Sequence, residues 1–159
     1  MLIGVVSDTH GHVEYAHDAA RMLQTFDVAA VLHCGDIGSP EIVRAFAAWP
    51  TYYVFGNVDD PDRLRPAIEA AGATCCEQFG ALRLAETNVA LLHGHDERRL
   101  AEACRGGEFR LVCHGHTHVA KETWFGETLL LNPGALYRAS PHTLAIVELP
   151  TLRVERIAV

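Results

Sequence analysis

Short apolar runs alternate with amphipathic stretches through the first two thirds of the chain. Such runs are typical of buried strands, while apolar residues at every third or fourth position are typical of helices with one buried face. The predicted strands of this part lie at residues 2–6, 29–33 and 51–55. The alternation predicts a layered α/β fold.

Three helices are predicted between and after these strands. The apolar positions that mark their buried faces are Ala16, Ala19, Ala20 and Leu23 in the first, Ile42, Val43 and Phe46 in the second, and Leu64 and Ile68 in the third. The second helix has a defined start, because Ser39 suits the N-cap and Pro40 the first helical position. The third is expected to end near Gly72.

Strand patterns dominate the rest of the chain. The further apolar runs lie at 73–78, 82–86, 89–93 and 109–113, with one helix predicted over 97–105. Two hairpins are then predicted around the turn sequences "GE" and "PT", with strands at 121–125, 128–132, 143–149 and 153–159. No repeat or linker interrupts the pattern, so we expect one domain over residues 1–159, built from two stacked sheets with helices outside.

Composition and charge narrow the class of protein. The 159 residues are 49% hydrophobic and 21% charged, which is ordinary for a globular protein. A net charge of −7 argues against general nucleic-acid binding, which needs a basic surface. No segment approaches the ~20 apolar residues of a membrane span, and the first residues lack the basic start of a signal peptide. Five cysteines without regular spacing are typical of reduced thiols, so we expect a cytoplasmic protein.

At the carboxyl ends of five predicted strands the chain carries Asp, Asn or His, often beside a glycine. The sequences are "VVSDTHGH", "VLHCGD", "YVFGNVDD", "LLHGHD" and "VCHGHTH". Because loops converge on ligands at the carboxyl ends of strands in α/β sheets, these side chains are expected to meet in one cluster. Its members would be Asp8, His10, Asp36, Asn57, His93, His116 and His118.

A metal centre accounts for such a cluster, because unpaired carboxylates and imidazoles are costly to bury. Imidazole together with carboxylate suits Mn, Fe, Co, Ni or Zn better than Mg or Ca. Seven ligands exceed the need of one tetrahedral ion, so we expect two ions that share a bridging carboxylate. Two divalent cations, two carboxylates and a bridging hydroxide leave a charge of about +1, which favours an anionic substrate such as a phosphate ester.

The polar motifs resemble those of a known family. In order along the chain, they are "DTHG" at 8–11, "CGD" at 34–36, "GN" at 56–57, "HGH" at 93–95 and "HGHTH" at 114–118. Their order and spacing resemble the calcineurin-like metallophosphoesterase superfamily, and especially its short, single-domain bacterial and archaeal phosphodiesterases. The resemblance extends from Ile3 to about Gly134. It implies a four-layered αββα sandwich of two mixed β-sheets flanked by helices, with a dinuclear metal centre.

The resemblance also implies roles for individual residues. One ion would be held by Asp8, His10, Asp36 and His118, and the other by Asp36, Asn57, His93 and His116. Asp36 would therefore bridge the two divalent ions, for which manganese is the first choice and Ni, Fe, Co or Zn are alternatives. The implied function is hydrolysis of small phosphate esters, chiefly diesters, by attack of a metal-bridging hydroxide.

A non-catalytic scaffold is the alternative function, because the same fold serves as a protein-binding subunit in retromer, where the metal site has decayed. The counterpart of His10 is changed in that scaffold, whereas the "DTH" sequence is intact here. The intact sequence favours the enzyme. The physiological substrate, the native metal and the oligomeric state stay open at this stage, and a homo-oligomer is compatible with the sequence.

Two departures from the family's pattern bear on the chemistry. Related enzymes often carry a histidine that protonates the leaving group where this chain has Val58, and the frequent "NPGS" is "NPGA" here, with Ala135. His95 and His12 lie in motif loops and are the candidates for the missing acid, although a solvated loop position is an equal alternative for both. Arg138 follows the "NPG" sequence, where contact with substrate and a plain surface position are also equal alternatives.

Overall fold

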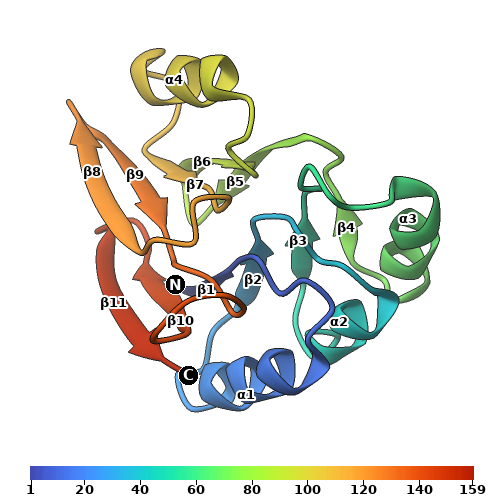
Figure 1. The fold of residues 1–159 in the computed structure, drawn as a ribbon. Coiled ribbons are helices and arrows are strands. Elements are labelled where there is room, and N and C mark those ends of the chain that lie inside the picture. Colours follow the sequence, from blue (N-terminus) through green and yellow to red (C-terminus); the bar gives the residue numbers. More distant parts are fainter.

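The computed structural model describes residues 1–159 and consists of two β-sheets packed face to face, with helices on both outer sides (Figure 1). The helices are α1 (Val13–Gln24), α2 (Pro40–Ala45), α3 (Pro61–Ala70) and α4 (Glu97–Arg105). The strands are β1 (Leu2–Val6), β2 (Ala30–His33), β3 (Thr51–Tyr53), β4 (Thr74–Cys75), β5 (Phe79–Leu84), β6 (Thr87–Leu92), β7 (Leu111–Cys113), β8 (Lys121–Phe125), β9 (Thr128–Asn132), β10 (Thr143–Glu148) and β11 (Arg153–Ala158).

Both sheets are mixed. The first has the order β11-β10-β1-β2-β3-β4. In it, β1 to β4 run parallel, β10 pairs antiparallel with β1, and β11 pairs antiparallel with β10. The second has the order β5-β6-β7-β9-β8, with β6, β7 and β9 parallel and an antiparallel strand at each edge. The predicted αββα sandwich of two mixed sheets is confirmed.

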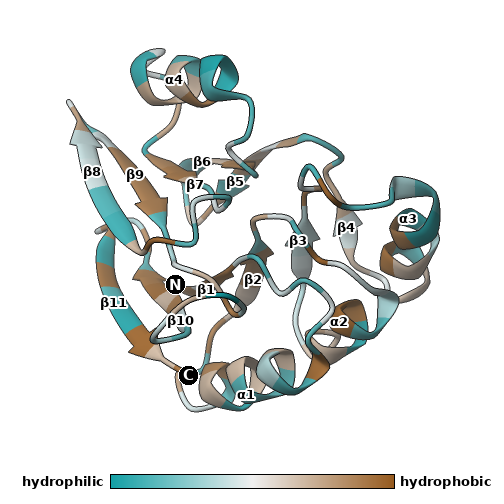
Figure 2. Cartoon of the chain, viewed as in Figure 1, coloured by the Kyte–Doolittle hydropathy of each residue, from teal (hydrophilic) through white to brown (hydrophobic).

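Three apolar layers hold the sandwich together. Helices α1, α2 and α3 pack on the outer face of the first sheet, and α4 packs on the second sheet at the opposite side of the molecule (Figure 1). Between the sheets lies a core of aliphatic side chains that includes Val5, Leu32, Leu91 and Leu131. Hydrophobic residues run along β9, whereas much of α4 is hydrophilic because only one of its faces is buried (Figure 2).

The predicted strand at 73–78 is reduced to the two residues of β4, and a second difference from the predicted elements lies around β5 and β6. The apolar pattern predicts a strand over 82–86, but β5 ends at Leu84 and residues Ala85 and Glu86 form the turn into β6. Both turn residues have positive φ, 43° and 64°, as a two-residue hairpin turn requires. Neither is a glycine or an asparagine, so the sequence carries no sign of this turn.

The predicted strands at 51–55 and 109–113 are also longer than β3 and β7, which have three residues each. Val54 and Phe55 leave the strand but stay buried as the chain bends toward Asn57. All four helices are present as predicted. None of them combines the length and the apolar character needed to cross a membrane.

Candidate metal centre

The seven predicted ligands lie in loops that follow strands of both sheets. The first sheet supplies Asp8, His10, Asp36 and Asn57, after β1, β2 and β3, and the second supplies His93, His116 and His118, after β6 and β7. The parallel pairing of these strands within each sheet brings their carboxyl ends to one edge, as the sequence pattern predicts.

Asp36 occupies the middle of the cluster. Its Oδ2 atom lies 3.4 Å from Nε2 of His10 and 3.3 Å from Nε2 of His93, and its side chain is only 5% exposed. One carboxylate oxygen therefore faces imidazoles from both sheets.

Asp8 and two histidines form a second group of candidate metal ligands. Its Oδ1 atom lies 3.2 Å from Nε2 of His118 and 3.8 Å from Nε2 of His10, and these two imidazole nitrogens are 3.4 Å apart. Asp8 is fully buried, yet this Oδ1 atom accepts no hydrogen bond. A buried carboxylate oxygen without a donor is costly, so the site needs a cation or protonated group at this place.

Asn57 and His116 lie on the His93 side of the cluster. Oδ1 of Asn57 is 3.1 Å from Nε2 of His93, and the ring of His116 is 5.1 Å from the ring of His93 in an edge-on arrangement. The main-chain N–H of His116 donates to Oδ2 of Asp8 at 3.1 Å. All seven predicted residues are therefore gathered at one place.

Five of the seven residues have left-handed backbone conformations. The φ angles are 54° for Asp8, 46° for His10, 52° for Asp36, 69° for His116 and 60° for His118. Such conformations cost about 1 kcal/mol or more for residues other than glycine, and they concentrate at functional sites. Stability alone does not account for so many in one cluster.

At two positions beside the carboxylates, only glycine leaves enough space for them. A Cβ atom on Gly56 would stand 1.9 Å from Oδ1 of Asp36, and one on Gly115 would stand 1.8 Å from Oγ of Ser7 and 2.5 Å from Oδ2 of Asp8. Any larger residue at either position would displace a carboxylate. The glycines of the "GN" and "HGHTH" sequences thus have a steric basis.

Asp59, which the sequence reasoning did not single out, fastens two of the loops together. Its carboxylate accepts hydrogen bonds from the main-chain N–H groups of Gly56, Ile37 and Gly38, at 2.8, 3.1 and 2.9 Å. These groups belong to the loops of Asn57 and Asp36, so Asp59 sets the distance between those two side chains. The only clue to it in the sequence is its place in "GNVDD".

The charged states of the central pair support each other. Burial acts to raise the pKa of Asp36, but the hydrogen bond and charge of His93 outweigh it and leave that pKa below its ordinary value. Burial acts to lower the pKa of His93, but Asp36 raises it above the ordinary range. For His10 burial prevails and lowers the pKa, so this imidazole is neutral at neutral pH, as a metal ligand must be.

His33 is fully buried and lies beneath the cluster. Its Nδ1 accepts from the N–H of Gly35 at 3.2 Å, so its Nε2 donates to Oγ1 of Thr9 at 3.0 Å. Thr9 in turn donates to the carbonyl oxygen of Ile37 at 3.0 Å. This buried chain of hydrogen bonds ties the loop of Asp8 to the loop of Asp36.

Acid is expected to destabilise the metal-free protein through His33. Burial lowers the pKa of His33 from 6.5 to about 3, so between these pH values the unfolded chain binds a proton that the folded chain does not. The contribution of His33 to the free energy of unfolding is therefore fully present above pH 6.5 and is lost as the pH falls. At pH 5 the loss from this group is about 2 kcal/mol. Urea unfolding at pH 7 and pH 5 measures the loss. His33→Asn should lose about 2 kcal/mol less, whereas His17→Asn, on the exposed face of α1, should behave as wild type; equal losses in all three proteins would contradict the assignment.

The two candidate acids occupy different surroundings. His95 is exposed and lies beside the ligands, with its ring 5.6 Å from the ring of His93 and 6.2 Å from that of His116. His12 stands at the start of α1, with its ring stacked 3.7 Å from the ring of Tyr137. The structure thus places His95 among the predicted ligands and gives His12 an aromatic partner.

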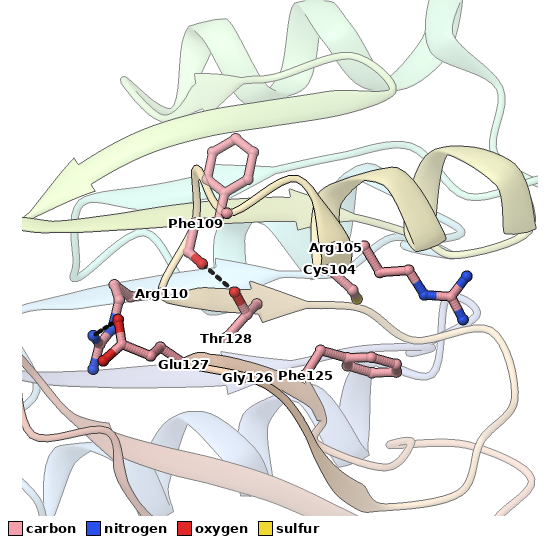
Figure 3. Close-up of a pocket in the computed structure, with 9 residues that line it drawn as sticks. Cys104, Arg105, Phe109, Arg110, Phe125, Gly126, Glu127 and Thr128 are labelled. Atoms are coloured by element: carbon pink, nitrogen blue, oxygen red, sulfur yellow. Dashed lines mark hydrogen bonds and ion pairs between the residues drawn. The ribbon is translucent and has the colours of Figure 1, made fainter.

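A cavity of about 520 Å³ lies away from this cluster. It is lined by residues at the end of α4 and at the beginnings of β7 and β9, among them Arg105, Arg110, Phe125 and Thr128 (Figure 3). The predicted ligands follow the carboxyl ends of the strands, whereas this cavity adjoins their amino ends. It therefore contributes nothing to the candidate metal centre.

The chain is similar to known phosphoesterases in both sequence and structure. Residues 1–151 match the model of the calcineurin-like phosphoesterase superfamily domain. A phosphodiesterase of Methanocaldococcus jannaschii is 27% identical over 138 residues, which cover 84% of this chain and 83% of that protein. The solved structure of an archaeal phosphodiesterase superposes with a TM-score of 0.92 at 25% identity, covering 100% of both chains.

A second solved structure shares the fold as well. The structure of Vps29 from Entamoeba histolytica, solved with zinc, has a TM-score of 0.68 and 20% identity, covering 99% of both chains. At that identity, the likeness concerns the fold alone.

Proposed function

The chain belongs to the calcineurin-like phosphoesterase superfamily, and from that premise we propose that it is a phosphodiesterase whose active site holds two divalent transition-metal ions. The observation that carries the proposal is the position of Asp36, whose Oδ2 faces His10 on one side and His93 on the other. A carboxylate shared between two sets of imidazoles is what a bridging ligand requires.

The residues present fit two ions. Asp8, His10 and His118 offer donor atoms that all lie within 4.8 Å of one another, and so do Asp8, Asp36 and His93. A cation would also satisfy the buried Oδ1 atom of Asp8, which has no hydrogen-bond donor. The mixture of imidazole and carboxylate donors suits Mn, Fe, Co, Ni or Zn, and we propose manganese.

We assign the ligands by the family's pattern. Asp8, His10, Asp36 and His118 would hold one ion, and Asp36, Asn57, His93 and His116 the other. When bound, such ions lower the pKa of water and neutralise charge on phosphate oxygens.

The surrounding residues position these groups. Ser7 donates from Oγ to Oδ2 of Asp8 at 2.5 Å, and Asn132 donates from Nδ2 to the carbonyl oxygen of Gly115 at 2.9 Å and to Oγ1 of Thr117 at 3.0 Å. The first bond orients the carboxylate of Asp8, and the other two fasten the loop of His116 and His118 to the end of β9. The ligands thus keep their places without having to be ordered by substrate.

His95 is the histidine that we place nearest to the leaving group. Partial desolvation by its neighbours, and then the charges of His93 and His116, lower the pKa of this largely exposed imidazole. It is therefore a weak proton donor, and His12 is the second candidate.

The scaffold function is less well supported. A protein-binding scaffold does not need two buried aspartates and three histidines in strained backbone conformations at one place. This chain keeps all seven residues of the metal pattern, and five of them form the two groups of close metal-ligating atoms. We therefore propose that the chain is an enzyme that hydrolyses small phosphate diesters, and we expect it to act in the cytoplasm.

Removal and replacement of metal test the function directly. Protein stripped with EDTA should not hydrolyse bis(p-nitrophenyl) phosphate, and Mn, Co or Ni should restore the rate at least about tenfold better than Mg, because imidazole ligands suit these ions. Metal analysis of the restored protein should give two ions per chain. Vigorous hydrolysis with Mg alone, or no hydrolysis with any metal, would contradict the proposal.

A further inference from the structure

A row of aromatic rings leads away from one side of the candidate metal centre. The ring of Tyr137 lies 5.7 Å from that of His10 and is stacked on His12 at 3.7 Å, with an angle of 19° between the planes. The row continues from His12 to Tyr15 at 5.9 Å and from Tyr15 to His142 at 4.2 Å. It begins at a predicted metal ligand and ends at the protein surface.

The loop between β9 and β10 brings Tyr137 and Arg138 to this place. The N–H of Leu136 donates to the carbonyl oxygen of Ser7 at 3.1 Å, which fastens the loop beside Asp8. The carbonyl oxygen of Arg138 lies 3.5 Å from Nδ1 of His118. Tyr137 and Arg138 are therefore next to two predicted ligands of the same ion.

Arg138 is exposed and pairs with no carboxylate, although the protein carries a net charge of −7. Its guanidinium lies over the ring of Tyr137, with Cζ 5.3 Å from the ring centre. The ring of Tyr137 thus contacts both the ring of His12 and a guanidinium that no carboxylate holds in place. A flat group could take the place of this guanidinium beside the ring.

Packing alone does not explain this arrangement. The rings of Tyr137, His12, Tyr15 and His142 are only partly buried. Tyr15 packs against the core below the first sheet, but Tyr137 is not among the side chains that pack against any of the buried clusters. Stacked rings beside a site for a charged ligand are typical of recognition of planar groups, and a free guanidinium is typical of phosphate recognition.

We propose that Tyr137 and Arg138 form a subsite for a ring-bearing arm of the phosphodiester. The ring of that arm, aryl or nucleobase, stacks on Tyr137, and the guanidinium of Arg138 moves to the phosphate group. The subsite selects diesters with a planar arm over purely alkyl diesters. This inference rests on the proposed function, because the metal centre would hold the phosphate.

Binding of product-like monoesters tests the subsite without relying on turnover. The probes are phenyl phosphate, adenosine 5′-monophosphate and methyl phosphate, titrated into the manganese-loaded protein by calorimetry. We expect the two ring-bearing probes to bind about 5- to 100-fold more tightly than methyl phosphate, as stacking on one aromatic side chain allows.

Three variants and a control separate the contributions. Tyr137→Ala should reduce the preference for the ring-bearing probes to less than about threefold, and Tyr137→Phe should keep it, because the ring remains. Arg138→Gln should weaken all three probes about 5- to 20-fold, because it removes a charge beside the phosphate. Trp124→Ala, which removes an aromatic residue that is 54% exposed on β8, should leave every affinity unchanged.

Several results would overturn the subsite. They are equal affinity of wild type for phenyl and methyl phosphate, an undiminished preference in Tyr137→Ala, an equal loss for all probes in Tyr137→Ala, and no effect of Arg138→Gln. Hydrolysis of bis(p-nitrophenyl) phosphate by wild type is measured alongside. If wild type hydrolyses the diester but shows no ring preference, the subsite fails and the proposed function stands; if it hydrolyses no diester, the proposed function fails whatever the affinities are.

Discussion

Asp36→Asn is expected to lower diester hydrolysis by at least about 10³-fold and to leave the protein with less than one metal ion per chain. Asp36 is the carboxylate that faces both His10 and His93, so its charge contributes to both metal positions of the proposed centre. Loss of the charge that holds two cations removes several kcal/mol of transition-state stabilisation, which corresponds to this factor. Hydrolysis of bis(p-nitrophenyl) phosphate and elemental analysis of the same samples measure the two effects.

Asparagine is a sharper replacement than alanine at this position. The φ angle of Asp36 is 52°, a conformation that asparagine tolerates and alanine does not, so Asp36→Asn removes the charge without straining the loop. Asp62→Asn is the matched control, since this aspartate is 99% exposed on α3. Two ions per chain and near-normal turnover in Asp36→Asn would refute the shared-carboxylate assignment.

The layers of the fold could be predicted because burial leaves a direct trace in the sequence. The strands β1 and β2 are covered on both faces, so they are continuous apolar runs, and α1 shows its buried face at helical spacing. The turn at Ala85 and Glu86 could not be predicted, because its positive φ angles are imposed by the pairing of β5 with β6. Tertiary contacts override the preference of these residues.

The ligand candidates could also be predicted, since each follows an apolar run in the sequence. The residues that position these ligands leave no comparable pattern in the sequence. Asp59 acts by accepting from three main-chain N–H groups of two different loops, and no sequence pattern shows which N–H groups will meet. Tyr137 is likewise far along the chain from His12, on which it stacks.

Val58 is expected to leave the reaction without a proton donor at this position. The residue is 60% exposed at the edge of the cluster, and its main-chain N–H donates to Oδ1 of Asp36 at 3.4 Å. A histidine here would present an imidazole to the departing oxygen, whereas valine has no proton to give. The lowered pKa of His95 leaves that histidine a poor substitute.

Hydrolysis is therefore expected to depend steeply on the pKa of the leaving alcohol, with activated aryl diesters cleaved readily and alkyl diesters about 10²- to 10⁴-fold more slowly than general acid catalysis would allow. Rates across a series of diesters with graded leaving groups measure this dependence. Val58→His should flatten it and raise the rates for poor leaving groups most. His95→Ala and His12→Ala should steepen it further if either imidazole supplies part of the proton, whereas Val58→Leu, which adds only bulk, should leave the slope unchanged. A flat dependence in wild type, with the chemical step rate-limiting and both alanine variants unaltered, would show that the acid lies elsewhere.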